Sequence, residues 1–335
     1  MKKLISLKKI ISILFLFLIS ISGFSRIKPI SINEIPTTTQ KAELGIFLMN
    51  IYDIDMAANS FYADFYLWCK WKGEIDPLKN IEFVNYVEKW GFTKEYIYDT
   101  IQILKNGYKY NVMRIEGRFF HPFSLKKFPV DRQFLDIQVE NSEFTIDKLI
   151  YVPALNESGF RDELDIPGWE IDKLHTKIYT NQYDTNFGLP EITKESYGNL
   201  LFELEILRPF SFFMWKLMLP LIVVLISSMG TMMIFPGYID ARISIPIGAL
   251  LAAVFLQQSY TSNLPDVGYM VMMDKVYVVS YILIVANFVQ AIITANKVKN
   301  EEEEEYAKVK RFDFKYIIIS TVLFVLCNAI IIVTS

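Results

Sequence analysis

The chain has 335 residues, of which 52% are hydrophobic and 15% aromatic, and its net charge at neutral pH is −3. This composition is too apolar for a soluble protein and too charged for a chain made only of membrane spans. A nucleic-acid partner is excluded, because binding phosphates requires clustered lysine and arginine. We therefore expect a water-exposed domain joined to a membrane domain.

The first 25 residues have the pattern of a secretory signal peptide. Lysines at positions 2, 3, 8 and 9 precede an apolar stretch at 10–21, and Gly23 and Ser25 are small residues suited to cleavage before Arg26. A retained N-terminal anchor is the alternative. Under either interpretation the following domain, residues 26–208, is exported.

Residues from about 36 to 208 alternate in the manner of β-strands. Between Phe61 and Trp71 every odd position is apolar, and Leu200–Leu207 interleaves apolar residues with glutamates. In Phe134–Glu140, we expect Leu135, Ile137 and Val139 to point inward and Asp136, Gln138 and Glu140 outward. Such strands, separated by turn residues, predict an antiparallel sandwich. The less regular segment 79–98 allows a short helix.

Four apolar stretches in the C-terminal part, residues 209–335, are each long enough to cross a membrane. The predicted helices span about 210–235, 241–263, 268–297 and 314–335. Lysine and arginine flank the short loop 298–313, which is therefore expected to be cytoplasmic. The sandwich and the C-terminus then lie outside, as the signal peptide requires. Cys69 and Cys327 are expected in different compartments, so no disulfide joins them.

No group of residues suggests catalysis or a bound cofactor. The two histidines, His121 and His175, are too few and too scattered for a zinc site. The sequence has no glycine-rich phosphate loop, nucleophile elbow or cysteine–histidine pairing. We expect neither an enzyme, nor a metal site, nor a cofactor.

The second predicted span has a stripe of unusual character. Residues 243–265 carry no charge, and as a helix they extend roughly 34 Å. Along one face recur Ser244, Gly248, Leu251, Phe255, Gln258 and Ser262, above an acid, Asp240. The stripe suits a pore lining. It equally suits a helix inside a bundle, where small and hydroxyl residues permit close contact.

The order of parts resembles the pentameric ligand-gated ion channels (the Cys-loop receptor superfamily), in particular their prokaryotic members. Four motifs carry the resemblance: Phe128-Pro-Val-Asp-Arg-Gln133; Pro167-Gly-Trp169; Leu207-Arg-Pro-Phe-Ser-Phe-Phe213 with Leu219-Pro220; and Thr261-Ser-Asn-Leu-Pro265 with Tyr269. The cysteines that flank the first motif in animal receptors are missing, as is usual for prokaryotic members. The resemblance implies an extracellular immunoglobulin-like β-sandwich, an all-α four-helix transmembrane domain, and a homopentamer in a bacterial inner membrane.

The resemblance also assigns a pore. It places Asp240 at the cytoplasmic mouth, where five carboxylates would select cations, although Arg242 could pair with Asp240 or a neighbour. Leu251 and Phe255 would form an apolar constriction that closes by dewetting. Pro246 could occupy the first turn of the helix. The expected pore-lining residues are Asp240, Ser244, Gly248, Leu251, Phe255, Gln258 and Ser262.

The family binds its ligands between adjacent extracellular domains and transmits the signal where the two domains meet. The resemblance places Glu140, Ser142, Phe144, Tyr179, Tyr183, Phe187 and Tyr197 at the ligand site. Aromatic rings there can hold an ammonium group. The sequence leaves an amine, a proton and a divalent cation open as agonist. The expected coupling residues are Asp53, Pro129, Asp131, Arg208 and Pro265, with an ion pair between Asp131 and Arg208.

Two other functions remain open from the sequence. A membrane-anchored periplasmic binding or scaffold protein would bind a solute and pass no current. An integral membrane enzyme is disfavoured by the lack of catalytic groups.

Overall fold

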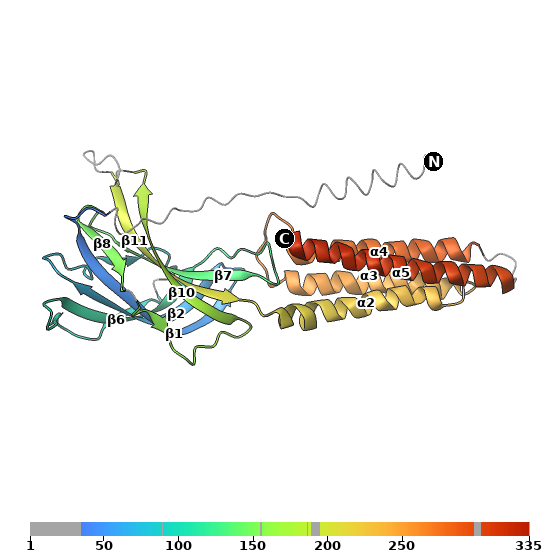
Figure 1. The fold of residues 1–335 in the computed structure, drawn as a ribbon, viewed down its shortest axis with the longest axis horizontal. Coiled ribbons are helices and arrows are strands. Elements are labelled where there is room, and N and C mark those ends of the chain that lie inside the picture. Colours follow the sequence, from blue (N-terminus) through green and yellow to red (C-terminus); the bar gives the residue numbers. More distant parts are fainter. Residues whose placement is uncertain are drawn as a thin grey trace.

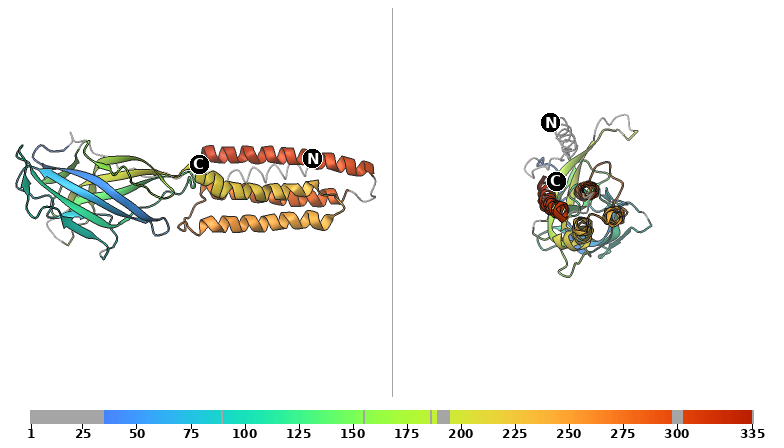
Figure 2. Two further views of the ribbon diagram at one scale, coloured as in Figure 1. Left: turned by 90° about the horizontal axis from the view of Figure 1, so that it is seen from below. Right: turned by 90° about the vertical axis from the view of Figure 1, so that its right-hand side faces the viewer.

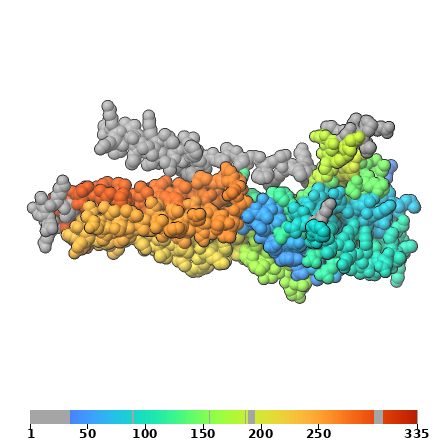
Figure 3. Space-filling model, turned by 180° about the vertical axis from the view of Figure 1, so that it is seen from behind, coloured from blue at the N-terminus to red at the C-terminus, as the bar shows by residue number. Residues whose placement is uncertain are grey.

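The computed structural model describes residues 35–334, with the exception of residues 89, 155, 186, 189–194 and 298–302. The predicted signal peptide and the first residues of the predicted exported domain lie outside this range. A β domain and a bundle of long helices meet end to end, so the molecule is elongated (Figures 1 and 3).

The β domain consists of two sheets that share one apolar core. The larger sheet has the order β4(Thr93–Tyr96)-β6(Lys109–Phe120)-β2(Ser60–Trp71)-β1(Gln40–Asp55)-β8(Leu149–Pro153), with β5(Gln102–Ile103) on β6 and β9(Gly159–Phe160) on β1. The smaller sheet has the order β10(Glu170–Tyr183)-β11(Glu195–Leu207)-β7(Arg132–Asn141)-β3(Ile81–Phe83). The predicted sandwich is confirmed.

The alternation of side chains sets the inner face of each strand. The odd residues of β2 from Phe61 to Trp71 are all buried, as predicted, and so are Leu135, Ile137 and Val139 of β7. The prediction that the even residues of β7 face solvent was wrong for Asp136 and Glu140, which are buried. Neighbouring side chains cover both carboxylates and bind them, His121 at Asp136 and three donors at Glu140.

The segment 79–98 contains no helix among its described residues; it forms β3, β4 and a connecting turn. Apart from one turn bond, from the amide of Tyr86 to the carbonyl of Phe83 at 3.3 Å, its backbone bonds mainly outward to both sheets. The amide of Val84 donates to the carbonyl of Gln138 at 3.0 Å, and that of Val87 to the carbonyl of Arg118 at 3.0 Å. Asn85 also donates its side-chain amide to the carbonyl of Asp136 at 2.7 Å. These bonds replace the local ones that a helix would make.

The bundle contains four helices that are long and apolar enough to cross a membrane, and they run side by side (Figure 2). The first span begins as a π-helical turn, η2(Phe212–Met218), continues as α2(Leu219–Gly230) and ends in a 3-10 turn, η3(Thr231–Met233). It is followed by α3(Ile239–Thr261), α4(Met272–Ala295) and α5(Glu303–Thr334).

Two boundaries differ from the predictions. The last helix begins at Glu303, so residues 303–313, predicted as loop, are helical. This stretch contains three Glu, two Lys and one Arg, residues that favour helix, but it is too charged for a hydropathy scan to identify it as part of a membrane span. Pro246 lies inside α3 and not in its first turn. The helical structure is interrupted around Pro236–Gly237, and α3 already begins at Ile239.

Candidate pore, ligand pocket and coupling interface

The face that α3 turns toward its own bundle is opposite to the predicted pore stripe. Buried residues of α3 are Arg242, Pro246, Ala249, Ala253 and Tyr260. A position two residues further along a helix is rotated by about 200°. Five stripe residues follow a buried one at this interval: Ser244, Gly248, Leu251, Phe255 and Ser262. The stripe therefore does not serve packing within the chain.

All seven predicted pore-lining residues are exposed in the single chain. Leu251 and Phe255, in the middle of α3, are 57% and 63% exposed. Asp240 and Ser244 lie toward the end of α3 far from the β domain, and Gln258 and Ser262 toward the near end. The exposed face thus runs from acidic through apolar to polar. Large apolar side chains that remain exposed in such a row indicate a surface completed by another molecule or another copy.

Arg242, which the sequence places beside Asp240, does not belong to the exposed face. Its side chain is fully buried and pairs with Asp313 of α5, with Nη2 2.6 Å from Oδ2. The partner is therefore neither Asp240 nor a sequence neighbour. Asp240 has no ion pair with any residue in the described part of the chain. The stripe consequently carries a carboxylate without a compensating cation.

The predicted ion pair between Asp131 and Arg208 is present where the β domain meets the bundle. Arg208 Nε lies 2.9 Å from Asp131 Oδ1, and both side chains are buried. Gln133 donates to the other carboxylate oxygen at 2.7 Å. The guanidinium lies over the ring of Trp169 at 4.1 Å and reaches Met56 Sδ at 3.4 Å. Arg208 thus joins the β1–β2 turn to the residue before β7, and its guanidinium also lies over the ring of Phe212, at the start of the first span, at 5.3 Å.

The loop that precedes Asp131 is bonded to the start of α4. The carbonyls of Lys126 and Phe128 accept from the amides of Met272 and Met273, at 3.0 and 3.2 Å. The Phe128 ring stacks on Tyr260, at the end of α3, with 5.9 Å between centroids. These contacts join the loop to the end of α3 and to the start of α4, on either side of the linker between these helices.

The other three predicted coupling residues lie in the same region with different surroundings. Pro129 is buried in the loop, and Pro265 is half-buried in the α3–α4 linker. Asp53, near the end of β1, pairs with Arg118 of β6 and so binds within the β domain. The β1–β2 turn follows at residues 56–59. Met56 is the residue of this turn that contacts Arg208.

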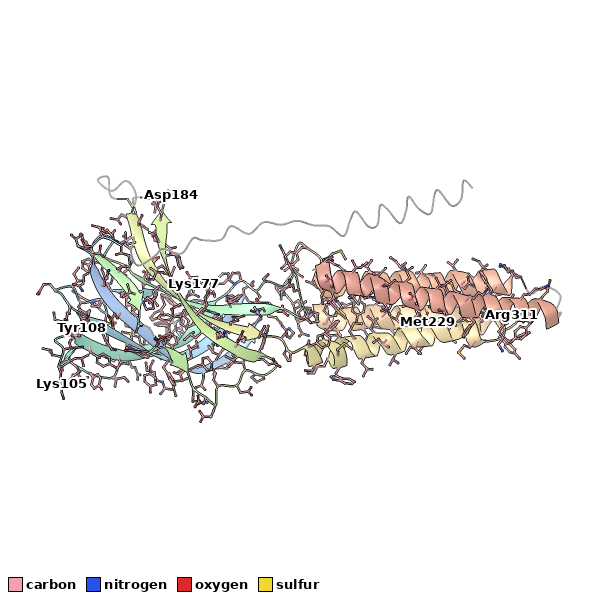
Figure 4. The ribbon with its side chains drawn as sticks, in the orientation of Figure 1. Lys105, Tyr108, Lys177, Asp184, Met229 and Arg311 are labelled. Carbon is pink, nitrogen blue, oxygen red and sulfur yellow. The ribbon has the colours of Figure 1, made fainter. Side chains whose placement is uncertain are left out.

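Four of the predicted ligand-site residues form one cluster at the loop end of the β10–β11 hairpin, where Figure 4 labels Asp184 at the end of β10. The Tyr183 ring lies 5.8 Å from Phe187 and 5.7 Å from Tyr197. Its hydroxyl donates to Glu140 Oε2 at 3.0 Å. The cluster joins a carboxylate to three aromatic rings, which is the composition of an ammonium site.

Two further residues of this cluster, Asn181 and Asn199, were not predicted. Both donate side-chain amides to Glu140 Oε1, Asn199 at 3.2 Å. The alternation of Tyr179, Asn181 and Tyr183 along β10 was the available signal, since every second residue shares a face. Their pairing with β11 sets Asn181 opposite Tyr197, and a sequence does not show that register.

The remaining three predicted ligand-site residues have other surroundings. Tyr179 is buried and donates to Gln138 at 3.0 Å. Phe144 packs against the core. Ser142 donates to the carbonyl of Asn80 and lines a cleft of about 600 Å³ together with Lys79, Phe92 and Lys94, and no aromatic residue of the cluster lines that cleft.

The cluster also shifts the titration of its own groups. Burial raises the pKa of Glu140 above its ordinary value of 4.5, against the hydrogen bonds from Asn199, Asn181 and Tyr183, which lower it. Burial and the nearby Glu140 raise the pKa of Tyr183 to about 12. The carboxyl group is therefore the member of the cluster that changes charge closest to neutral pH.

The known proteins to which this chain is similar are ion channels. No protein-family profile matches the chain. It is 22% identical over 245 residues to a proton-gated ion channel of Gloeobacter violaceus, covering 68% of this chain and 65% of the relative. It is 25% identical over 170 residues to a glutamate-gated chloride channel of Drosophila melanogaster, covering 50% of this chain and 35% of the relative. A gamma-aminobutyric acid receptor subunit beta of Lymnaea stagnalis is 23% identical over 186 residues, covering 56% of this chain and 36% of the relative.

The chain therefore spans less than two thirds of the length of these relatives. All three are ion channels, a class without enzymatic activity, which supports the prediction that the protein is not an enzyme. A β-sandwich followed by four membrane-spanning helices fits a membrane channel. The fold and these relatives together support membership of the chain in the Cys-loop receptor superfamily of pentameric ligand-gated ion channels.

Proposed function

We propose that the protein is a ligand-gated ion channel made of five identical subunits and selective for cations. The observation that carries this proposal is the exposed stripe of α3, which faces away from the chain's own bundle. Five copies around an axis would enclose the stripe and form a continuous passage. The kinship with channels supports the same arrangement.

The orientation follows from charge. Residues 297–315, between the third and fourth spans, contain six lysine and arginine residues, and a short loop rich in these residues remains in the cytoplasm. The β domain and the C-terminus then face the periplasm of a bacterial inner membrane. Asp240 accordingly lies at the cytoplasmic mouth.

Purified protein reconstituted into planar bilayers tests the function directly. We expect currents when small amines are added on the side of the β domain, and a native mass of five subunits. A binding or scaffold protein would bind the amine and pass no current. Any other subunit number would remove the proposed pore.

Selectivity should depend on Asp240. Asp240→Asn removes five carboxylates from the cytoplasmic mouth, while Arg242 stays buried and paired. In a tenfold potassium chloride gradient, we expect the reversal potential to move by roughly half of its value or more toward zero. Asp162→Asn, which removes an exposed acid of the β domain, is the matched control and should leave the potential unchanged. An unchanged potential in Asp240→Asn would rule out the carboxylate ring.

For the agonist we propose a small primary or quaternary amine bound at the cluster of Glu140, Tyr183, Phe187 and Tyr197. The rings attract a cation through their faces, and Glu140 supplies the opposite charge. A neighbouring subunit would close the site, as the position of ligands between subunits in the family implies.

The pH dependence of activation separates an amine from a proton as agonist. The pKa of Glu140 is raised by burial, so its carboxylate is neutralised at a higher pH than an ordinary glutamate. Amine activation should therefore weaken as the pH falls, beginning above 4.5. Currents that grow on acidification without amine would identify the proton instead, and loss of activation by EDTA would identify a divalent cation.

In the variant Glu140→Gln, amine activation should no longer weaken as the pH falls through the range in which Glu140 is protonated. The half-maximal amine concentration should rise about tenfold or more. Glu143→Gln is the matched control, because Glu143 is exposed in the loop that follows β7 and bonds to Asn80. Equal effects of the two substitutions on amine activation would contradict the assignment of Glu140.

A further inference from the structure

A network of buried polar side chains lies in the half of the bundle far from the β domain. Its centre consists of Arg242 of α3, Gln290 and Thr294 of α4, and Asp313 of α5. All four residues are buried. Figure 4 labels Arg311, two residues before Asp313, at the far end of the bundle. A polar network at this depth is unusual, because charged groups are costly inside a membrane.

Arg242 is fixed by three partners on three elements. Its Nη2 donates to Asp313 Oδ2 at 2.6 Å, its Nη1 to Thr294 Oγ1 at 3.1 Å, and its Nε to the carbonyl of Thr231 at 3.2 Å. The donors of a guanidinium have a rigid planar geometry, so these bonds set the direction of the side chain. The end of α3 that lies far from the β domain, which we call its inner end, is thereby held against η3, α4 and α5.

Asp313 is satisfied from two sides. One oxygen accepts from Arg242, and the other accepts from Gln290 Nε2 at 3.0 Å. The residue is 2% exposed, and Arg242 is fully buried. Separating the two would leave an unpaired charge on each side in an apolar medium, so the pair resists opening.

The remainder of α5 makes few polar contacts with the bundle, among them the hydrogen bond from the Tyr316 hydroxyl to Asn287 Oδ1 of α4 at 3.0 Å. It packs on α4 and η3, and many of its apolar side chains, such as Val322, Leu323 and Leu326, are exposed. The Arg242–Asp313 pair is the ionic link between α5 and α3 among the described residues. Arg242 lies two positions from Asp240, at the proposed cytoplasmic mouth.

We propose that the Arg242–Asp313 pair couples the position of α5 to the opening of the pore. This inference rests on the proposed channel function. Any tilt of the inner end of α3 either carries α5 with it or separates a buried ion pair. Because the pair resists separation, α5 moves with the pore helix, and the energy of the pair enters the open–closed equilibrium.

A double-mutant cycle of channel activation tests the coupling. The four proteins are the wild type, Arg242→Gln, Asp313→Asn and the double variant, compared by amine activation curve, unitary conductance and reversal potential. Each single substitution should shift the half-maximal amine concentration about tenfold, and the double variant should shift it no further. Conductance and reversal potential should stay near wild type, since neither side chain lies on the exposed stripe.

Further variants distinguish coupling from a general loss of stability. Ser320→Ala is the matched control on α5, where the hydroxyl bonds to the carbonyl of Ile317 in its own helix, and it should leave the curve unchanged. Arg242→Lys keeps the positive charge but loses the planar guanidinium with its several donors. Its half-maximal amine concentration should therefore lie between those of the wild type and Arg242→Gln. If Asp313→Asn does not assemble by native mass, Gln290→Leu removes one donor to Asp313 and keeps both charges, and it should give a smaller shift.

The outcomes separate the two proposals. A wild type that passes no current would overturn the channel function. A conducting wild type whose single variants have unshifted curves, or whose shifts add in the double variant, would overturn the coupling alone.

Discussion

Channels in which Leu251 is replaced by alanine should conduct in the absence of any ligand, and Phe255→Ala should act in the same direction. These side chains are the two large apolar groups on the stripe, and both are exposed in the single chain. A ring of five such groups closes a pore by excluding water. Truncating them widens the ring and lets water remain, so the ligand-free current should rise at least tenfold, on the order of a coupling of 1–2 kcal/mol.

The ligand-free current is measured in bilayers at equal protein incorporation, with a pore blocker defining the baseline. Val254→Ala is the matched control, because it removes apolar volume from an exposed neighbouring position of α3 that is not on the stripe. If Leu251→Ala and Phe255→Ala conduct no more without ligand than Val254→Ala, the apolar constriction lies elsewhere.

Replacing Arg208 by glutamine should separate ligand binding from conduction. Asp131 and Arg208 form a buried pair, and removing one partner of such a pair costs about 3–5 kcal/mol. Arg208 contacts three segments of the β domain and also the first span. The lost stabilisation therefore weakens the contact between the two domains. We expect amine binding by calorimetry to persist while the amine-evoked current falls about a hundredfold or more.

Arg132→Gln is the matched control for this experiment. Arg132 neighbours Asp131 and also pairs with an acid, Glu205, but it is half-exposed and its partner lies within the same sheet. Its current should be near wild type. A variant Arg208→Gln with normal current would exclude the coupling role, and one that also lost amine binding would indicate a damaged β domain instead.

Much of the architecture was predictable because it depends on local periodicity. A period of two in Phe61–Trp71 identified the buried face of β2, and a period between three and four identified the stripe of α3. Asp131 and Arg208 were paired through their motifs, and the structure shows the bond. Hydropathy located the four spans but placed the start of α5 too late, since charged residues can continue a helix beyond the membrane.

The sequence by itself determined which residues share a face, because that depends only on helix and strand geometry. It did not determine what those faces meet. Glu140 and Asp136 were read as solvated, and they are buried because residues from other strands bind them. The sequence suggested Asp240 or a nearby residue as the partner of Arg242, and its partner is Asp313, 71 residues away. Such partners are decided by tertiary packing, since a buried charge is stable only beside a counter-charge, wherever the chain brings one.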